Sequence, residues 1–249
     1  MNSTLEKSGH SKPLIILATG AWHLPECWDT VKGRLEAVGH DVLAPRLPTV
    51  CGPEAVNHTV THDKPWRADV ATVLDLVTPL FDTRRTALLV GHLYSGVVTT
   101  NTVPGHSVAE RAARGRRGGF IGAVYVCAFP VLDPGPRWFR RRRRFLVHHG
   151  ICLPNPGKDA LPAAEVQKWI AKLQHQSQQA TEEPSDWCSN DLRDLDRPLT
   201  YLVCENVQVL PLHFQERFVE HIPNMKVMRC DSGCSPFLGQ PDTITKVIV

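Results

Sequence analysis

A glycine-bounded turn near the middle of the chain carries the strongest chemical signal. The sequence GHLYSG at residues 91–96 follows the apolar run Thr86–Val90 and precedes an apolar helical stretch. A strand, a sharp turn and a helix in this order form the context of a nucleophile elbow, which needs small residues and displays its central side chain above a sheet. The central residue is Leu93, which can neither attack a carbonyl group nor transfer a proton. The turn therefore predicts elbow geometry without a nucleophile.

This turn must be positioned by a sheet, because short apolar runs recur along the chain with amphipathic stretches between them. Six runs are expected to form strands: Leu14–Ala18, Asp41–Pro45, Thr86–Val90, Ile121–Cys127, Leu199–Cys204 and Lys226–Cys230. Helical spacing of apolar residues is visible at about 25–38 and 66–80. Buried strands that alternate with helices predict an α/β fold with a doubly wound, mostly parallel sheet.

The alternation of strands and helices breaks between residues 132 and 198. Six prolines punctuate this stretch, and only Ala163–Gln174 has the pattern of a firm helix. A connection of this length is too long for an ordinary loop within a compact domain. We predict one domain over residues 1–249, with a helical cap inserted at about 132–198 above the strand ends, where ligands bind in such sheets.

The order and spacing of several segments resemble the α/β-hydrolase superfamily. The closer resemblance is to a branch of small hydrolase-like proteins common in fungi, related to plant methylesterases and hydroxynitrile lyases. The matching segments are GAWHLPECW at 20–28, DKPWRADV at 63–70, LLVGHLYSGVV at 88–98, AERAARGRRGGFIGAVYVCAF at 109–129, LPAAEVQKWIAKLQHQS at 161–177, and TYLVCENVQVLPLHFQ with DSGCSPFL within 200–238. The resemblance runs from about residue 13 to 245 and implies the α/β-hydrolase fold.

The same resemblance implies where a catalytic triad would lie. Such hydrolases carry a serine at the elbow, an acid in the pattern C-x-x-D-x-x-x-P and a histidine in the pattern G-H-S-P-F-L. This chain has Leu93, Val207 and Cys234 at these three positions. We therefore predict that nucleophile, acid and base are all substituted, which excludes ordinary Ser-His-Asp hydrolysis.

The resemblance also implies an oxyanion hole, which in this fold is made by backbone N–H groups. One donor would follow the elbow at Tyr94, and the other would lie in the loop after the first strand, at Ala21 or Trp22. These donors persist whatever residue occupies the elbow, so a substrate carbonyl can still be polarised. Together with nearby side chains, this predicts catalytic roles for Trp22, His23 and Tyr94. Substrate contacts are predicted at Ala21, His92, Leu93, Val207 and Cys234.

Two classes of function follow from a capped pocket without a triad. In the first, the protein binds an apolar polyketide or terpenoid-like intermediate and accelerates a cyclisation or isomerisation of the pericyclic type, which needs shape and a hydrogen bond but no nucleophile. The resemblance implies this substrate class, because such proteins accompany fungal polyketide or terpenoid pathways. In the second, the protein is a catalytically silent ligand binder or partner subunit. An unusual hydrolase or lyase is a third, smaller alternative.

Composition excludes several other classes of protein. Five of the 28 basic residues form the run Arg140–Arg144, and the other 23 stand against 25 acidic ones. We interpret this run as a solvated surface segment, with anion or membrane-surface binding as the alternative, and we expect no nucleic-acid partner. No apolar run reaches membrane-spanning length, and the N-terminus lacks an apolar signal core, so a cytoplasmic location is expected.

Cysteine and histidine spacing bears on cofactors. Eight cysteines are scattered without a CxxC pair, which favours reduced and mostly buried thiols. No element carries ligands at metal-binding spacing, so no metal and no other cofactor is predicted. A homodimer is kept as a hypothesis.

Overall fold

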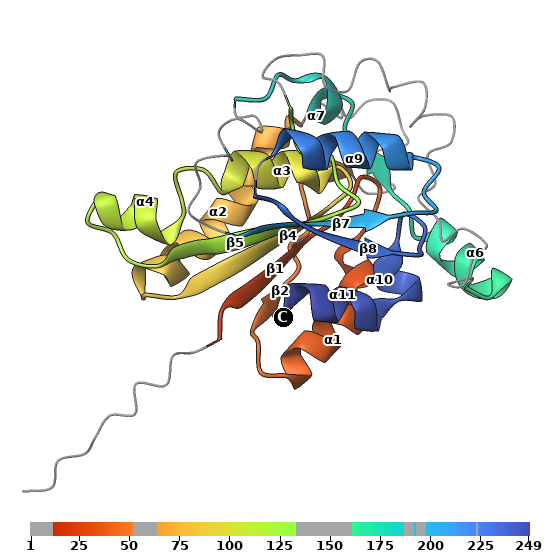
Figure 1. Ribbon diagram of the computed structural model, residues 1–249, viewed down its shortest axis with the longest axis horizontal. Coiled ribbons are helices and arrows are strands. Elements are labelled where there is room, and N and C mark those ends of the chain that lie inside the picture. The colour runs from red at the N-terminus through yellow and green to blue at the C-terminus, as the bar shows by residue number, and fades with distance from the viewer. Residues whose placement is uncertain (1–11, 52–63, 133–160, 187–191, 193–197, 223) are drawn as a thin grey trace, which may run out of the picture.

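A six-stranded parallel sheet runs through the centre of the computed structural model (Figure 1), which describes residues 12–51, 64–132, 161–186, 192, 198–222 and 224–249. The strands lie in the order β2-β1-β4-β5-β7-β8 and every neighbouring pair is parallel. Their bounds are β1 Leu14–Ala18, β2 Val42–Leu43, β4 Thr86–His92, β5 Gly119–Val126, β7 Leu199–Cys204 and β8 Lys226–Cys230. The predicted doubly wound parallel sheet is confirmed.

Helices cover both faces of this sheet, as Figure 1 shows. The helices α2, α3 and α9 lie on one face, and α1, α10 and α11 lie on the other. The bounds on the first face are Trp66–Asp82, Ser95–Thr102 and Leu212–His221, and those on the second are Asp29–Ala37, Pro236–Gly239 and Pro241–Ile248. A short helix α4, Val108–Ala113, precedes β5. Every residue of α3 is buried, which makes it the central helix behind the elbow.

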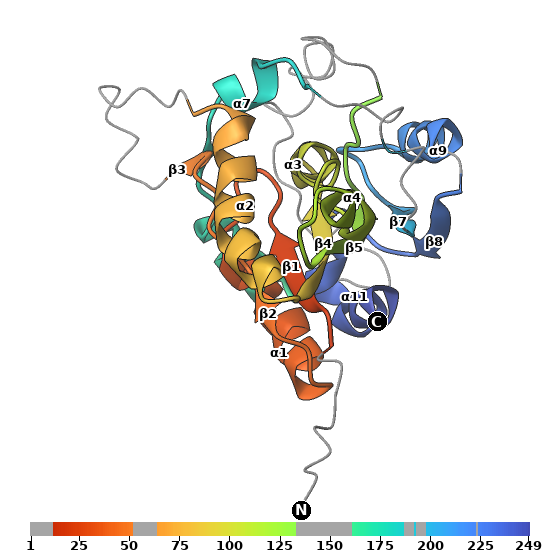
Figure 2. The ribbon, with the colours of Figure 1, turned by 90° about the vertical axis from the view of Figure 1, so that its left-hand side faces the viewer.

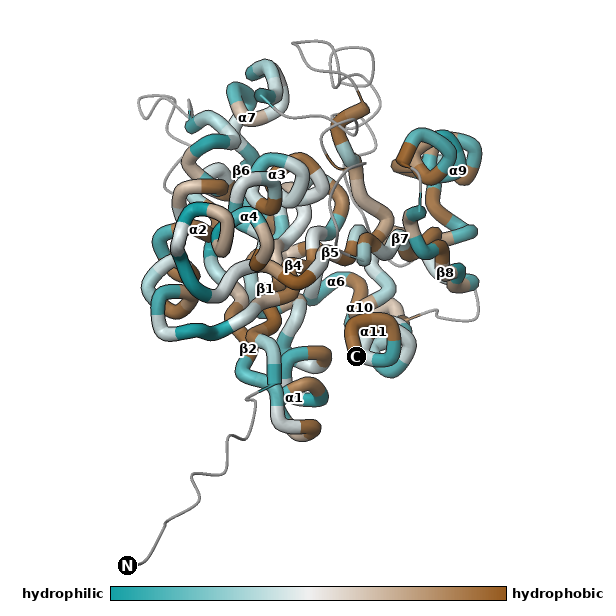
Figure 3. Tube along the Cα trace, turned by 60° about the vertical axis from the view of Figure 1, so that its left-hand side comes forward, coloured by the Kyte–Doolittle hydropathy of each residue, from teal (hydrophilic) through white to brown (hydrophobic). Residues whose placement is uncertain are grey.

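The core follows from the strands themselves. All five residues of β1 and all six of β7 are buried, as expected for parallel strands that are covered on both faces. Figure 3 shows the apolar residues gathered along β1, β4 and β5 at the centre of the molecule. Within the described residues, no helix is both long and apolar enough to cross a membrane.

Strand register decides which loops meet. Ala18 of β1 pairs with Gly91 of β4, and His92 of β4 pairs with Val126 of β5. Because the strands are parallel, the loops that follow them leave from the same edge of the sheet. The loop after β1 and the turn after β4 are therefore neighbours.

Some predicted elements differ in length from the observed ones. The strand expected at Asp41–Pro45 is reduced to β2, because this edge strand pairs with β1 through two residues only. The helix expected at about 25–38 is divided into a 3-10 turn, Pro25–Trp28, and the helix α1.

The segment predicted as a cap is described in part. Residues 133–160, 187–191 and 193–197 lie outside the described residues, and so does the run Arg140–Arg144. The described part holds α6 (Ala163–Ala171), a short strand β6 (His175–Gln176) and α7 (Gln179–Glu182). Strand β6 pairs antiparallel with β3, Val50–Cys51, in a separate two-stranded sheet. Figure 2 shows α7 beside one end of α2.

Candidate functional site

The turn between β4 and α3 has the backbone geometry of an elbow. Leu93 lies between the two elements with a φ of +46°, in the left-handed region that a branched side chain seldom adopts. Its N–H donates to the carbonyl of Val126 (3.2 Å), and its own carbonyl accepts from the N–H of Phe129 (2.9 Å). A Cβ atom added at Gly96 would come within 2.6 Å of the Phe129 backbone. The tight packing of β4, α3 and the loop after β5 thus enforces the turn that the sequence predicts.

The loop after β1 lies directly against this elbow. A Cβ atom at Gly20 would approach within 2.5 Å of His92 Nδ1 and 3.3 Å of the Leu93 Cβ, so only glycine fits. Trp22 follows with a φ of +66°. The structure therefore brings the predicted residues Ala21, Trp22 and His23 together with His92 and Leu93.

Two buried histidines lie edge to face beside the elbow. The ring centroids of His23 and His92 are 5.6 Å apart. His23 Nδ1 lies 2.8 Å from the Ala21 carbonyl, and because a carbonyl can only accept, Nδ1 carries the proton. Burial, and then the neighbouring His92, lowers the pKa of His23 from 6.5 to about 4. His23 is therefore neutral at neutral pH, with Nε2 free of a proton.

His92 contacts the residue at the predicted base position. Its Nε2 lies 2.8 Å from the Cys234 carbonyl and 3.8 Å from Cys234 Sγ. Since the carbonyl needs a donor, Nε2 carries the proton and cannot take one from the thiol. His92 Nδ1 is buried and has no hydrogen-bond partner within the described part of the chain. The geometry thus places Cys234 beside a histidine that does not act as its base, and His92 does not activate the thiol.

Tyr94 points its side chain away from this cluster. Its hydroxyl donates to Asp69 Oδ2 on α2 (2.7 Å). Asp69 also accepts from Thr49, from the backbone N–H at 3.0 Å and from the hydroxyl at 2.6 Å. The prediction that the Tyr94 side chain donates to a substrate is corrected, because the hydroxyl is engaged with a buried carboxylate. The predicted role of Tyr94 then depends on its backbone N–H alone.

Asp69 is a functional candidate that the sequence analysis missed. It is fully buried, and this burial raises its pKa from 3.8 to about 6 against the hydrogen bonds from Thr49 and Tyr94. A signal was present in the sequence, because Asp69 shares its helical spacing with the buried residues Trp66, Val73 and Val77. A carboxylate on the apolar face of a helix predicts a buried partner.

The segment after α6 contacts the loop after β1. The N–H of Gln174 donates to the Trp22 carbonyl (2.9 Å), and the Trp22 N–H donates to Gln176 Oε1 (3.4 Å). The next residue, Ser177, donates its N–H to the Thr49 carbonyl (2.8 Å). The described part of the predicted cap is thus bonded to the loop that carries one of the predicted oxyanion donors. This donor, at Trp22, already has a side-chain acceptor.

The loops after β7 and β8 hold the two remaining predicted positions. Val207 and Cys234 are both buried, and the loops are joined by a hydrogen bond from the Asn206 N–H to the Ser232 carbonyl (3.0 Å). At the predicted acid position the structure therefore has a buried valine side chain, which cannot act as a carboxylate.

Four buried thiols meet at the carboxyl ends of β5, β7 and β8, which the sequence analysis did not anticipate. They belong to Cys127, Cys204, Cys230 and Cys234. Cys204 and Cys230 are register partners on adjacent strands, with their sulfur atoms 3.5 Å apart. None of the four forms a disulfide, nor does Cys27, and burial raises the pKa of Cys127 well above its ordinary value. Within the described residues, no group of three or more potential ligands could hold a metal ion.

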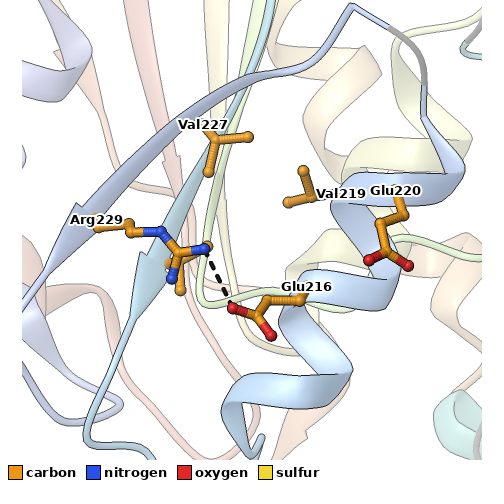
Figure 4. A pocket seen from close by; sticks show the side chains of 6 residues that line it. Glu216, Val219, Glu220, Val227 and Arg229 are labelled. Atoms are coloured by element: carbon orange, nitrogen blue, oxygen red, sulfur yellow. Dashed lines mark hydrogen bonds and ion pairs between the residues drawn. The ribbon is translucent and has the colours of Figure 1, made fainter.

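A separate hollow of about 570 Å³ lies between α9 and the edge strand β8 (Figure 4). Its walls combine apolar side chains with the ion pair between Arg229 and Glu216, whose nitrogen and oxygen are 3.2 Å apart. The lining residues are Val203, Glu216, Val219, Glu220, Val227 and Arg229. None of these belongs to the elbow or to the loops that surround it, so the hollow is distinct from the candidate site.

Comparisons with known proteins agree with the observed fold. The model of the alpha/beta hydrolase family matches residues 15–246, and the chain belongs to this family. Among curated proteins it is similar to the alpha/beta hydrolase nvfD of Aspergillus novofumigatus (strain IBT 16806), with 25% identity over 251 residues and 95% of each chain covered.

Solved structures share the fold at lower identity. A pyrethroid hydrolase from Sphingobium faniae JZ-2 has a TM-score of 0.66 at 18% identity, with 95% of both chains covered. An extracellular alpha/beta-hydrolase from a Paenibacillus species, described as sharing structural and functional homology with tobacco salicylic acid binding protein 2, has a TM-score of 0.68 at 16% identity, with 96% of this chain and 98% of that one covered. A methylesterase from Arabidopsis has a TM-score of 0.66 at 16% identity, covering 94% and 96%. The predicted resemblance is confirmed for the superfamily and the fold.

Proposed function

We propose that this protein is a non-hydrolytic member of its family, which binds an apolar polyketide or terpenoid-like intermediate and accelerates a cyclisation or isomerisation. The single observation that carries this proposal is the buried Leu93 at an intact elbow with a φ of +46°. An elbow of this kind displays a nucleophile in a hydrolase. A leucine there provides shape without reactivity.

The surroundings of Leu93 support the same reading. In our proposal Val207 and Cys234 occupy the acid and base positions, where a valine cannot orient an imidazole and a cysteine does not supply one. The neighbouring His92 donates its Nε2 proton to the Cys234 carbonyl, so it does not act as a substitute base toward that thiol. At these three positions, transfer of an acyl group to the protein has no nucleophile–base pair to use. Esters and aldehydes of a bound intermediate are thereby protected from attack.

A ring closure of the pericyclic type needs neither a nucleophile nor a base. Holding a flexible chain in a reactive conformation removes much of the entropic part of the barrier. A hydrogen bond to a carbonyl conjugated with the reacting alkene lowers it further, by about 1–3 kcal/mol for one donor. The Tyr94 backbone N–H is the group that we assign to this donation. His23, whose one N–H is bonded to the Ala21 carbonyl, can only accept a hydrogen bond through Nε2, and Leu93, Val207 and Cys234 form the apolar floor.

A silent ligand-binding protein is the second candidate. The engagement of the Tyr94 hydroxyl with Asp69, and of the Trp22 N–H with Gln176, favours it, because both reduce the number of donors open to a substrate. Binding alone needs only the apolar walls.

The two candidates are separated by incubating a polyene ketone that closes slowly by itself in water, with and without protein. The enzyme should raise the rate of closure and narrow the mixture of stereoisomers. Leu93→Asp should abolish this acceleration, because a charge in the floor is costly to desolvate, whereas the control Leu93→Met keeps the floor apolar and should retain it. Tight binding with an unchanged rate and an unchanged ratio of stereoisomers would assign the protein to the silent class.

A further inference from the structure

A carboxamide from the segment after α6 lies directly beside the loop after β1. The Trp22 N–H donates to an oxygen of Gln176, at 3.4 Å. Because an N–H can only donate, it selects the oxygen of the carboxamide, and the nitrogen Nε2 must occupy the other branch of the same planar group. Gln176 Nε2 is therefore fixed next to the loop that carries the predicted oxyanion donor.

This nitrogen is a buried donor without an acceptor. Within the described residues, Gln176 Nε2 is shielded from solvent and makes no hydrogen bond. Leaving a buried N–H unpaired costs free energy, and such groups in native proteins call for an explanation. The backbone around it is well held, because Gln176 pairs with Val50 in the β3–β6 sheet and Gln174 donates to the Trp22 carbonyl. The unpaired donor is thus held in place by its neighbours on both sides.

We propose that Gln176 Nε2 is a hydrogen-bond donor to a ligand oxygen, of the carbonyl, enolate or phenolate class. The Trp22 N–H acts through this residue: it holds Oε1, polarises the carboxamide and orients Nε2. The donor set of the site is then one backbone N–H at Tyr94 and one side-chain amide at Gln176. This assignment rests on the proposed function for its catalytic meaning, but the oxygen site itself requires no reaction.

The family's oxyanion hole would use two backbone donors, whereas here one of them is relayed through a side chain of the predicted cap. The consequence is a coupling of ligand recognition to the position of β6. Trp22, Gln174 and Gln176 are joined by hydrogen bonds, so a ligand oxygen that satisfies Nε2 should also stabilise the segment from residue 174 to 177.

The test uses 4-nitrophenol, whose phenol and phenolate forms differ in colour and whose phenolate oxygen mimics the charge of an enolate. Affinity of the full chain for each form is measured by absorbance titration across the pH range in which free 4-nitrophenol ionises. Gln176→Glu keeps an oxygen for the Trp22 N–H and replaces the NH₂ donor by an oxygen. Phenolate affinity should fall by tenfold or more, as expected for loss of one donor and gain of a like charge, while phenol affinity changes by less than about threefold.

Two further variants keep the test decisive. Gln178→Glu makes the same chemical change two residues later, on an exposed side chain outside the segment from residue 174 to 177, and it should leave both affinities unchanged. Gln176→Met keeps the length of the side chain and removes the amide donor without adding a charge, and it should lower phenolate affinity by about tenfold. Thermal melting confirms that each variant folds.

Equal losses for phenol and phenolate in Gln176→Glu, or equal effects of the two glutamate variants, would overturn the assignment and leave Gln176 as a structural tether. A wild-type protein that binds neither form would overturn it as well. A donor effect at Gln176 without acceleration of any ring closure would refute the proposed catalysis alone.

Discussion

Two buried groups near the site make opposite contributions to the pH dependence of stability. Burial lowers the pKa of His23 from 6.5 to about 4, so the folded state binds fewer protons than the unfolded state between these values. Its contribution to stability is complete above pH 6.5 and is lost as the pH falls to 4. Burial raises the pKa of Asp69 from 3.8 to about 6, so the folded state binds more protons there, and stability is gained as the pH falls through this window.

The two effects are similar in size. At 1.36 kcal/mol for each pKa unit, each shift corresponds to about 3 kcal/mol in the free energy of unfolding. The variant Asp69→Asn removes the Asp69 contribution and leaves the His23 contribution in place. We expect the variant, compared with the wild type, to lose about 3 kcal/mol more of its stability between pH 6.5 and 4, because the His23 effect is no longer balanced. His23→Gln should instead gain about 3 kcal/mol in the free energy of unfolding relative to the wild type as the pH falls from 6.5 to 4, because the Asp69 effect is then unbalanced. Urea denaturation at half-unit pH intervals measures both differences.

The double variant Asp69→Asn/His23→Gln is the control, since its pH dependence should run parallel to that of the wild type. The two groups have different hydrogen-bond partners, Ala21 for His23 and both Thr49 and Tyr94 for Asp69, so we expect their effects to add. Single variants whose curves both run parallel to the wild type would refute the reasoning, because neither shift would then exist. A loss on acidification in His23→Gln would refute the assigned sign for Asp69.

Three further results are expected. The purified protein should not hydrolyse p-nitrophenyl esters above a heat-denatured control or react with fluorophosphonate probes; stoichiometric labelling of any serine, Ser95 first, would revive the hydrolase alternative. Leu93→Ser alone should restore little esterase activity, whereas combining it with Val207→Asp and Cys234→His should act non-additively, since triad members work as a unit; equal rates for the single and triple variants would reveal another base. Gln215→Leu should lower the free energy of unfolding by about 3 kcal/mol in urea denaturation, because the fully buried amide bonds three backbone groups; a change below about 1 kcal/mol would contradict this.

The fold was predictable because its signals are local. Strands such as Leu14–Ala18 and Leu199–Cys204 are apolar over their whole length, and the run of β4 into a glycine turn specifies the elbow within a dozen residues. The strand β2 was overestimated because its length is decided by pairing with β1 and not by its own sequence. Apolar character shows that a segment is buried, but the neighbouring strand decides how many of its residues pair.

The site was predictable only as a set of positions. Which groups meet depends on contacts between residues far apart in the chain, such as Trp22 with Gln176 or His92 with Cys234. The direction of a side chain was equally hidden: the position of Tyr94 follows from the elbow, but its hydroxyl turns toward Asp69 because a buried carboxylate needs a donor. Buried polar residues at core spacing are the signal that a sequence analysis can still use.

The persistence of the elbow does not by itself argue for catalysis. A leucine with a positive φ costs free energy, yet the turn is enforced by packing, since Gly96 lies against the Phe129 backbone and the Leu93 backbone is bonded on both sides. Any residue at this position would be held in the same conformation. The argument for function must therefore come from groups whose state the packing does not require. The amide nitrogen of Gln176, which is buried and makes no hydrogen bond within the described residues, is such a group, because an apolar or fully bonded side chain at this position would satisfy the core more cheaply than a buried donor left open to a ligand.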